Sequence, residues 1–199
     1  MKNVSDTKEK ILKSAMELFT LRNYNSVGVQ EISDHAGIKK GTFYHHYPSK
    51  KELTLNAIDT IWEIYKSNIL DPVFNTDDHI LDKFENLIEA FYNYHIMRKA
   101  ESGFMTGCRL GNLALELSTQ DDEIRDKVEE KFTKWFEYFE KELRKSVVSG
   151  ELPQNTNVEK SAKAMLSYIE GTALFGKLYN EPEFMEILKK GIRKLVFEE

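Results

Sequence analysis

The sequence predicts an all-α protein, and three observations lead to this fold class. Only four prolines and ten glycines occur in 199 residues, which favours long helices over a sheet with many turns. Apolar residues recur at the i, i+3, i+4, i+7 spacing of helices that bury one face. Beyond residue 78, no segment shows the apolar–polar alternation of a strand. With 41% hydrophobic and 31% charged residues, the composition is that of a folded soluble protein.

The first two helices are expected within the first 37 residues. The first begins near Asp6 or Thr7, since either side chain can cap a helix, and the polar segment 22–28 ends it. Its apolar face consists of Ile11, Leu12, Ala15, Leu18 and Phe19. The second covers residues 29–36 and closes at Gly37, because glycine readily takes the left-handed conformation that ends helices.

A third short helix is predicted over residues 40–47, ending before a proline. A longer fourth helix starts with Ser49 as its cap and runs to residue 70. A polar break over residues 71–78, which contains Pro72, follows it. Further helices are predicted over 79–99, 107–118, 120–150, 157–179 and 181–199.

The first three helices match the helix-turn-helix arrangement, with glycine at the second turn. Five apolar side chains would fix the second and third helices against the first: Ile32, Ala36, Ile38, Phe43 and Tyr47. The other sides of the third helix would then face DNA with Lys40, Thr42, Tyr44, His45 and His46. Because Lys39 is a poor N-cap, the backbone N–H groups that start this helix lack a side-chain acceptor. Gly41 beside them permits close approach of a phosphate.

The charge distribution supports an anionic partner for the N-terminal segment. The whole chain has a formal net charge of −5. Residues 1–53 hold nine basic and six acidic residues, a net of +3, whereas the remainder holds 19 basic and 27 acidic residues, a net of −8. This asymmetry is modest, but its sign favours nucleic acid at the N-terminal end.

At these residues the chain resembles the tetracycline-repressor (TetR) family of bacterial transcriptional regulators. The resemblance rests on the stretches ILKSAMELF and VQEISDHAGIKKGTFYHHYPSKKELTLNAI, and on an all-helical remainder of suitable length. It implies a helix-turn-helix DNA-binding domain over residues 1–50 and an effector-binding and dimerisation domain over residues 51–199. It also implies a homodimer on palindromic double-stranded operator DNA. By position, the implied DNA contacts are Gln30, Lys39, Lys40, Gly41, Thr42, Tyr44, His45, His46 and Lys50.

The chain departs from the family pattern at two places. Many relatives have a serine or threonine that caps the second helix and touches phosphate, where this chain has Val27 and Gly28. A hydroxyl is also common where this chain has Lys39. The first departure removes a phosphate contact, whereas the second replaces one with a charged contact.

The C-terminal region offers candidates for an effector pocket and a dimer interface. An all-helical domain must place a pocket between its helices, although aromatic stripes of this kind are usually ordinary core. The candidate pocket residues are Phe91, Tyr94, Cys108, Arg109, Trp135, Phe139, Tyr168 and Phe175. The last two helices are implied by the resemblance to form the dimer interface through Met165, Ile169, Ala173, Ile187 and Ile192.

Cys108, the single cysteine, has two interpretations. The adjacent Arg109 could stabilise a thiolate and make it nucleophilic. The surrounding segment resembles a branch of the family that senses reactive electrophiles. The alternative is an inert cysteine that fills space beside small residues.

Other classes of protein and site find little support. His45 and His46 are adjacent on a helix, about 100° apart, and no HExxH spacing occurs, so neither a metal site nor a cofactor is expected. An enzyme would need a nucleophile–base pair or a phosphate loop that the sequence lacks. An effector-independent architectural DNA-binding protein remains the rival within DNA binding. The single cysteine and the absence of any apolar run of about 18 residues indicate a cytoplasmic protein without a membrane span.

Overall fold

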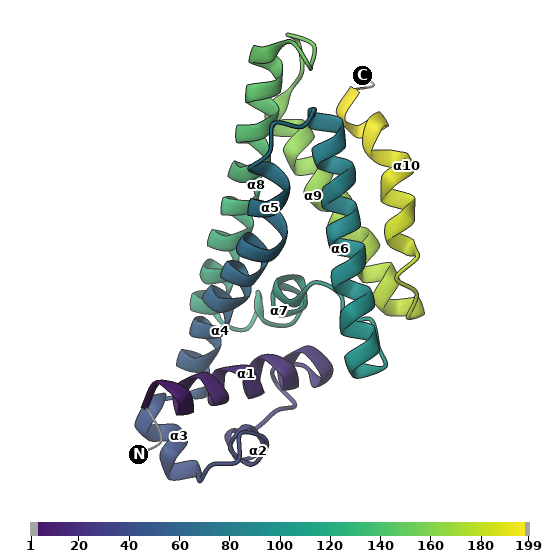
Figure 1. The fold of residues 1–199 in the computed structure, drawn as a ribbon. Helices are drawn as coiled ribbons and strands as arrows, with labels where there is room; N and C mark the ends of the chain where they lie inside the picture. The colour runs from purple at the N-terminus through teal and green to yellow at the C-terminus, as the bar shows by residue number, and fades with distance from the viewer. Residues whose placement is uncertain (1–3, 198–199) are drawn as a thin grey trace. The chain divides into compact units, whose positions relative to one another are not determined.

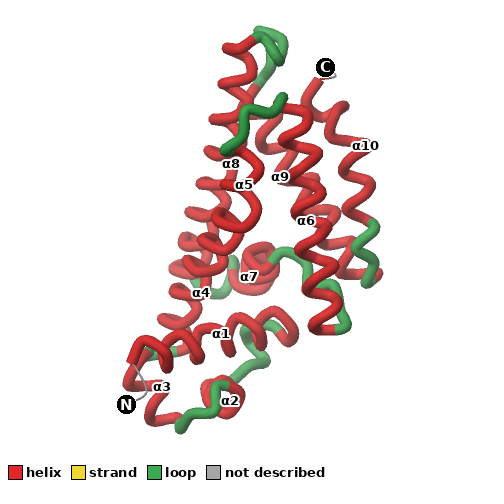
Figure 2. Tube along the Cα trace, in the orientation of Figure 1, coloured by secondary structure: helices red, strands yellow, loops and turns green. Residues whose placement is uncertain are grey.

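The computed structural model describes residues 4–197, and side chains for residues 6–187, 189, 191 and 192. Every regular element in this part of the chain is helical, which confirms the predicted fold class (Figures 1 and 2). The elements are α1 (Val4–Arg22), α2 (Val29–His35), α3 (Lys40–His46), α4 (Lys50–Tyr65), a π-helical turn η1 (Lys66–Leu70), α5 (Asp71–Phe74), α6 (Ile80–Ser102), α7 (Arg109–Leu117), α8 (Asp122–Ser149), α9 (Val158–Tyr179) and α10 (Phe184–Phe197).

The helices form two compact units. The first unit comprises residues 1–62 and 109–131, and the second comprises residues 63–108 and 132–199. The chain therefore passes between the units three times: within α4, just before α7 and within α8. The functional division after residue 50 stays a prediction, since a division by compactness does not test it.

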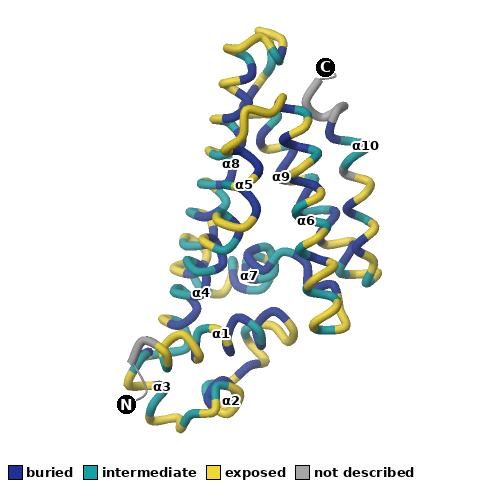
Figure 3. The backbone as a smooth tube through the Cα atoms, in the orientation of Figure 1, coloured by how far each residue is buried: buried dark blue, intermediate teal, exposed yellow. Residues whose placement is uncertain are grey.

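The core of the first unit fixes α2 and α3 against α1. Ile11, Ile32 and Phe43 are fully buried, and Tyr47 is 2% exposed. Ala36 and Ile38 are partly buried and pack on the same cluster. The dark-blue segments of α1 to α3 in Figure 3 mark this core. The five side chains predicted to point inward do so, and the polar side of α3 is left outward.

The helix ends follow the sequence signals closely. Gly37 has φ +66°, which is the left-handed conformation expected of the residue that closes α2. The Ser49 hydroxyl accepts a hydrogen bond from the backbone N–H of Glu52 at 3.0 Å, as a cap of α4 should. The first helix is already formed at Val4, the first residue that the structure describes, slightly before the start expected near Asp6 or Thr7.

The predicted break over residues 71–78 starts too early. The chain stays helical through η1 and α5, and it leaves the helix only after Phe74. Pro72 directly follows the π-helical turn η1, and Leu70 and Asp71 before it already have helical dihedrals, so the proline lies inside a continuous helical segment next to a π-bulge. Val73 and Phe74 are buried, so apolar packing continues across the expected gap.

In the second unit, α10 packs against both α9 and α6 (Figure 1). The rings of Phe74, Phe84 and Phe139 meet in its interior with centroids 5.6–6.0 Å apart. A buried ion pair joins α6 to α8, with Lys83 Nζ 3.5 Å from a Glu142 carboxylate oxygen. Across the described residues, no helix is long and apolar enough to cross a lipid bilayer.

Candidate DNA-binding surface and effector site

Helix α3 presents polar and aromatic side chains to solvent while its apolar side is held in the core. Phe43 is fully buried, whereas its neighbour Tyr44 is 48% exposed. The other predicted contacts on this surface are exposed or half-buried: Lys39, Lys40, Gly41, Thr42, His45 and His46. A fixed helix with an outward face of hydrogen-bond donors is what reading a DNA major groove requires.

The starts of α2 and α3 carry no side-chain cap. Lys39 occupies the N-cap position of α3 and Gly28 that of α2, and neither provides a cap hydrogen bond. The prediction that Lys39 does not cap α3 with its side chain is therefore confirmed. Backbone donors that no side chain covers favour an anion such as a DNA phosphate.

Gln30, the predicted contact on α2, is exposed in the first turn of its helix. Its amide donates a hydrogen bond to the Asp34 carboxylate at 2.8 Å. The amide would have to leave Asp34 to reach DNA, at the cost of one exposed hydrogen bond.

Lys50 has a different environment from the other predicted contacts. Its ammonium donates hydrogen bonds to the carbonyl oxygens of Tyr24 and Val27, both at 3.0 Å. It also lies 3.8 Å from the centre of the Tyr24 ring, a cation–π distance. Burial lowers the pKa of Lys50. This lysine fastens the turn between α1 and α2, so its placement argues against a phosphate contact.

Among the residues that the structure describes, the two adjacent histidines are not part of a cluster of metal-ligating side chains. The rings of His45 and His46 lie edge to face with centroids 5.3 Å apart. Within the described part of the chain, no group of three or more histidine, cysteine, aspartate or glutamate side chains could hold a metal ion.

Three of the predicted pocket residues lie together in the second unit. The Phe91 and Trp135 rings stack with centroids 5.7 Å apart, and Tyr65 contacts both Trp135 and Tyr94. Phe139 packs elsewhere, on Phe74 and Phe84. The remaining aromatic candidates lie near the C-terminal helix: Phe175 stacks on Phe184, and the Tyr168 hydroxyl donates to the Ile187 carbonyl. The eight candidates therefore do not line one site.

His95 belongs to the same ring cluster and was missed by the sequence interpretation. It is 3% exposed, and its ring lies edge to face with Tyr94 at 5.4 Å. Its Nδ1 atom and the Tyr94 hydroxyl are buried without a hydrogen-bond partner in the described structure. Burial lowers the pKa of His95 to about 4, so its ring is neutral at pH 7. Its position four residues after Phe91 was the available signal.

Cys108 and Arg109 are adjacent in sequence but belong to different units. Cys108 is half-buried, and its thiol forms a hydrogen bond with the Glu170 carboxylate. Burial raises the pKa of Glu170 to about 7, although the thiol hydrogen bond acts in the opposite direction. Arg109 is buried in the first unit, where it lines a small pocket with Asn112 and Glu116.

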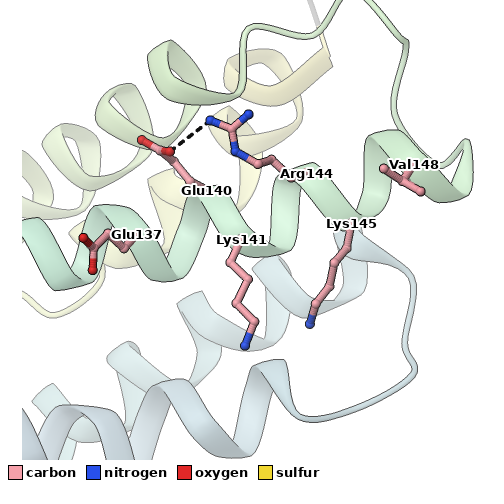
Figure 4. Close-up of a pocket in the computed structure, with 6 residues that line it drawn as sticks. All are labelled: Glu137, Glu140, Lys141, Arg144, Lys145 and Val148. Atoms are coloured by element: carbon pink, nitrogen blue, oxygen red, sulfur yellow. Dashed lines mark hydrogen bonds and ion pairs between the residues drawn. The ribbon is translucent and has the colours of Figure 1, made fainter.

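A larger groove lies on the outer surface of α8, and Figure 4 shows its lining. Its charged side chains are Glu137, Glu140, Lys141, Arg144 and Lys145, with Val148 at one end. None of the predicted pocket residues contributes to it. Its open, mixed-charge lining differs from the enclosed aromatic lining expected of an effector site.

Most of the predicted dimer contacts are covered by their own protomer. Met165, Ile169, Ala173 and Ile192 are at most 3% exposed, whereas Ile187 is 49% exposed. Other apolar side chains of α9 are exposed instead: Leu174, Phe175, Leu178 and Tyr179, at 48–67%. Leu188 and Leu195, on the same expected face of α10, have side chains outside the described residues.

A partly basic, exposed helix held on a three-helix core defines a helix-turn-helix DNA-binding protein, and the comparisons with known proteins identify its family. Residues 81–192 match the family described as "Tetracyclin repressor-like, C-terminal domain", and residues 11–57 match "Bacterial regulatory proteins, tetR family". The chain belongs to the TetR family of bacterial transcriptional regulators.

Similar proteins cover nearly the whole chain. An HTH-type transcriptional regulator encoded in the lacX 3' region of Lactococcus lactis is 28% identical over 197 residues, covering 97% of this chain and 96% of the relative. The HTH-type regulator LmrA of Bacillus subtilis is 28% identical over 170 residues, 85% of each chain. A TetR regulatory protein from Rhodobacter sphaeroides superposes with a TM-score of 0.82 at 25% identity, covering 94% of this chain and 97% of that one. These relatives are transcriptional regulators, and the chain has their helix-turn-helix region.

Proposed function

We propose that this chain is a repressor that binds a palindromic operator as a homodimer and releases it when a small molecule binds. The observation that carries the proposal is the outward face of α3, which holds Tyr44 and Lys40 on a helix fixed by Phe43. An operator in a bacterial genome places this activity in the cytoplasm.

The proposed set of DNA-contacting residues is smaller than the set that the family resemblance implied. Lys39 and Lys40 bind phosphate or guanine edges, and Gly41 allows the backbone to approach the DNA. Thr42, Tyr44, His45 and His46 supply hydrogen-bond donors to bases and phosphates. Gln30 also contacts DNA, after its amide gives up the hydrogen bond to Asp34. Lys50 is left out because its ammonium holds the turn between α1 and α2.

The proposed dimer interface is the exposed apolar side of α9 and the start of α10. Tyr179 and Phe175 both stack on Phe184, which joins the two helices into one surface. Leu174, Leu178 and Ile187 extend it. A symmetric dimer that buries this surface would present two α3 helices to two half-sites about 34–36 Å apart. The four buried residues Met165, Ile169, Ala173 and Ile192 are left out of the proposed interface because their own protomer covers them.

The proposed effector site is the ring cluster around Tyr94, His95 and Trp135. Leaving the Tyr94 hydroxyl and His95 Nδ1 unpaired costs about 1–3 kcal/mol each, so a ligand that supplies partners gains that free energy. The effector acts by a population shift: it binds better to a conformation whose α3 spacing does not fit the operator.

Selection of DNA duplexes from a random pool tests this function. We expect the purified protein to enrich a palindrome and to bind it as one dimer per site at 150 mM salt. Recovery of no common sequence would contradict the proposal. Small molecules that raise the melting temperature and also weaken operator binding would exclude an effector-independent architectural protein.

A second candidate is a sensor of reactive electrophiles on the same scaffold, favoured by the hydrogen bond between Cys108 and Glu170. A carboxylate with a pKa of about 7 is a suitable base to accept the thiol proton as sulfur attacks an electrophile. Cys108→Ser is expected to abolish release of operator by N-ethylmaleimide if this sensor operates. A reversible-ligand repressor would instead keep its response to its effector in this variant. Gel-shift titrations of both proteins distinguish the two.

A further inference from the structure

The turn between α1 and α2, residues 23–28, is held by a carboxylate from a distant helix. Glu116 of α7 accepts hydrogen bonds from the backbone N–H groups of Tyr24 and Asn25, one on each carboxylate oxygen, both at 2.8 Å. The Asn25 side chain donates to Gln120 at 3.1 Å, and Gln120 in turn donates to the Glu116 carbonyl at 2.8 Å. Glu116 and Gln120 therefore bind two backbone N–H groups and one side chain of the turn.

Lys50 holds the same turn through its carbonyl groups. Its ammonium bonds the carbonyl oxygens of Tyr24 and Val27, and the Val27 side chain is 1% exposed in the core. The Tyr24 N–H thus donates to Glu116, and the Tyr24 carbonyl accepts from Lys50. The turn has both its donors and its acceptors fixed by charged groups, which form stronger hydrogen bonds than neutral ones.

This turn determines how the DNA-binding helices are placed. It begins with Asn23 at φ +69° and ends at Gly28, the N-cap of α2. Helix α3 follows α2 after only a short turn, and both pack on the same core through Ile32 and Phe43. A displaced turn would therefore displace α2 and α3 together. All of these residues belong to the first unit.

We propose that Glu116 is a positioning residue for operator binding, which sets α2 and α3 by fixing the turn between α1 and α2 to the end of α7. The proposal rests on the α3 interface proposed above. Helix α7 begins directly after Cys108, where the chain enters the first unit from the second.

Removing the negative charge of Glu116 distinguishes a positioning role from a simple electrostatic effect, because the two predict opposite changes in DNA affinity. DNA repels a carboxylate, so loss of one acidic charge by itself strengthens DNA binding. Glutamine keeps the shape of Glu116 but has only one acceptor oxygen, so one backbone N–H loses its partner. If Glu116 positions the turn, Glu116→Gln weakens operator binding despite the more favourable charge.

The experiment measures binding of a duplex selected by the wild-type protein and of poly(dI-dC) by fluorescence anisotropy. We expect Glu116→Gln to bind the selected duplex roughly tenfold more weakly, the effect of one charge-assisted hydrogen bond, with binding to poly(dI-dC) unchanged or tighter. Glu129→Gln is the matched control, since Glu129 is an exposed glutamate of the same unit and loses the same charge. Gln120→Ala removes the contact with the Asn25 side chain and the hydrogen bond to the Glu116 carbonyl, but it leaves the Glu116 carboxylate in place, so it is expected to weaken specific binding two- to threefold.

Each outcome decides the proposal. Specific binding by Glu116→Gln as tight as that of Glu129→Gln overturns it. An equal loss on both DNAs, together with a lower melting temperature, shows a general folding defect in Glu116→Gln. The proposal is then overturned if Gln120→Ala also shows no selective loss of specific binding. Failure of the wild-type protein to select any duplex would instead contradict the proposed function.

Discussion

Replacing Lys40 and Tyr44 together by alanine is expected to weaken operator binding at least about thirtyfold. Each side chain lies on the outward face of α3, and each specific contact of this kind contributes about 1–3 kcal/mol. Folding should be little affected, because Tyr44 is 48% exposed and the core residue beneath it, Phe43, is retained. Anisotropy titrations at several salt concentrations measure the affinity and also count the released counterions.

The salt dependence identifies what Lys40 contacts. If it neutralises a phosphate, Lys40→Ala alone should reduce the slope of log K against log salt by about 1. Lys141→Ala, which removes an exposed lysine from α8, is the control for charge loss away from α3. Binding of the double variant within threefold of wild type would show that α3 does not face the DNA.

Leu178→Glu is expected to convert the dimer to monomers at micromolar concentration. Leu178 is 67% exposed on α9, in the middle of the apolar surface proposed as the interface. Two-fold symmetry would bury two new carboxylates for each substitution, and burying an unpaired charge costs several kcal/mol. Because a palindrome needs both α3 helices, operator affinity should fall at least a hundredfold with it. Sedimentation velocity measures the first effect and a gel shift the second.

Val148→Glu is the matched control for this change. Val148 is an 86% exposed apolar residue of α8, so it accepts the same new charge outside the proposed interface. This variant should remain dimeric and bind operator normally. A dimeric Leu178→Glu protein would move the interface away from the exposed side of α9.

The helix-turn-helix core could be predicted from sequence because its signals are local. Phe43 and Tyr47 are four residues apart, so they share one face of α3, and Gly37 marks the turn before it. The position of the Lys50 ammonium could not be found in this way. Its partners Tyr24 and Val27 precede it by more than 20 residues, and local spacing gives a side chain's charge but not its partner. Glu116 is harder still, since it lies 91 residues from the backbone that it binds.

The second unit shows a related difficulty. Helical spacing correctly identifies Met165, Ile169 and Ala173 as apolar positions that need cover. It does not say whether the cover comes from the same protomer or from a partner, and here the same protomer buries them. The break predicted over residues 71–78 starts too early for a similar reason: Pro72 follows a π-helical turn without ending the helix, and only the burial of Phe74 shows that the chain continues to pack there.

Because the chain crosses between the units three times, the DNA-binding part cannot be exchanged with that of a relative as one continuous N-terminal segment. Residues 1–62 do not form the first unit alone, because residues 109–131 supply the partners of its turn and of α4. Lys51, for example, bonds Asp121 at 3.0 Å and Glu123 at 2.7 Å. A chimera that takes only an N-terminal segment from a relative would join foreign helices to these acidic partners. Recombination or engineering that swaps the DNA-reading module must therefore carry α7 and the start of α8 with it, or replace the residues that meet them.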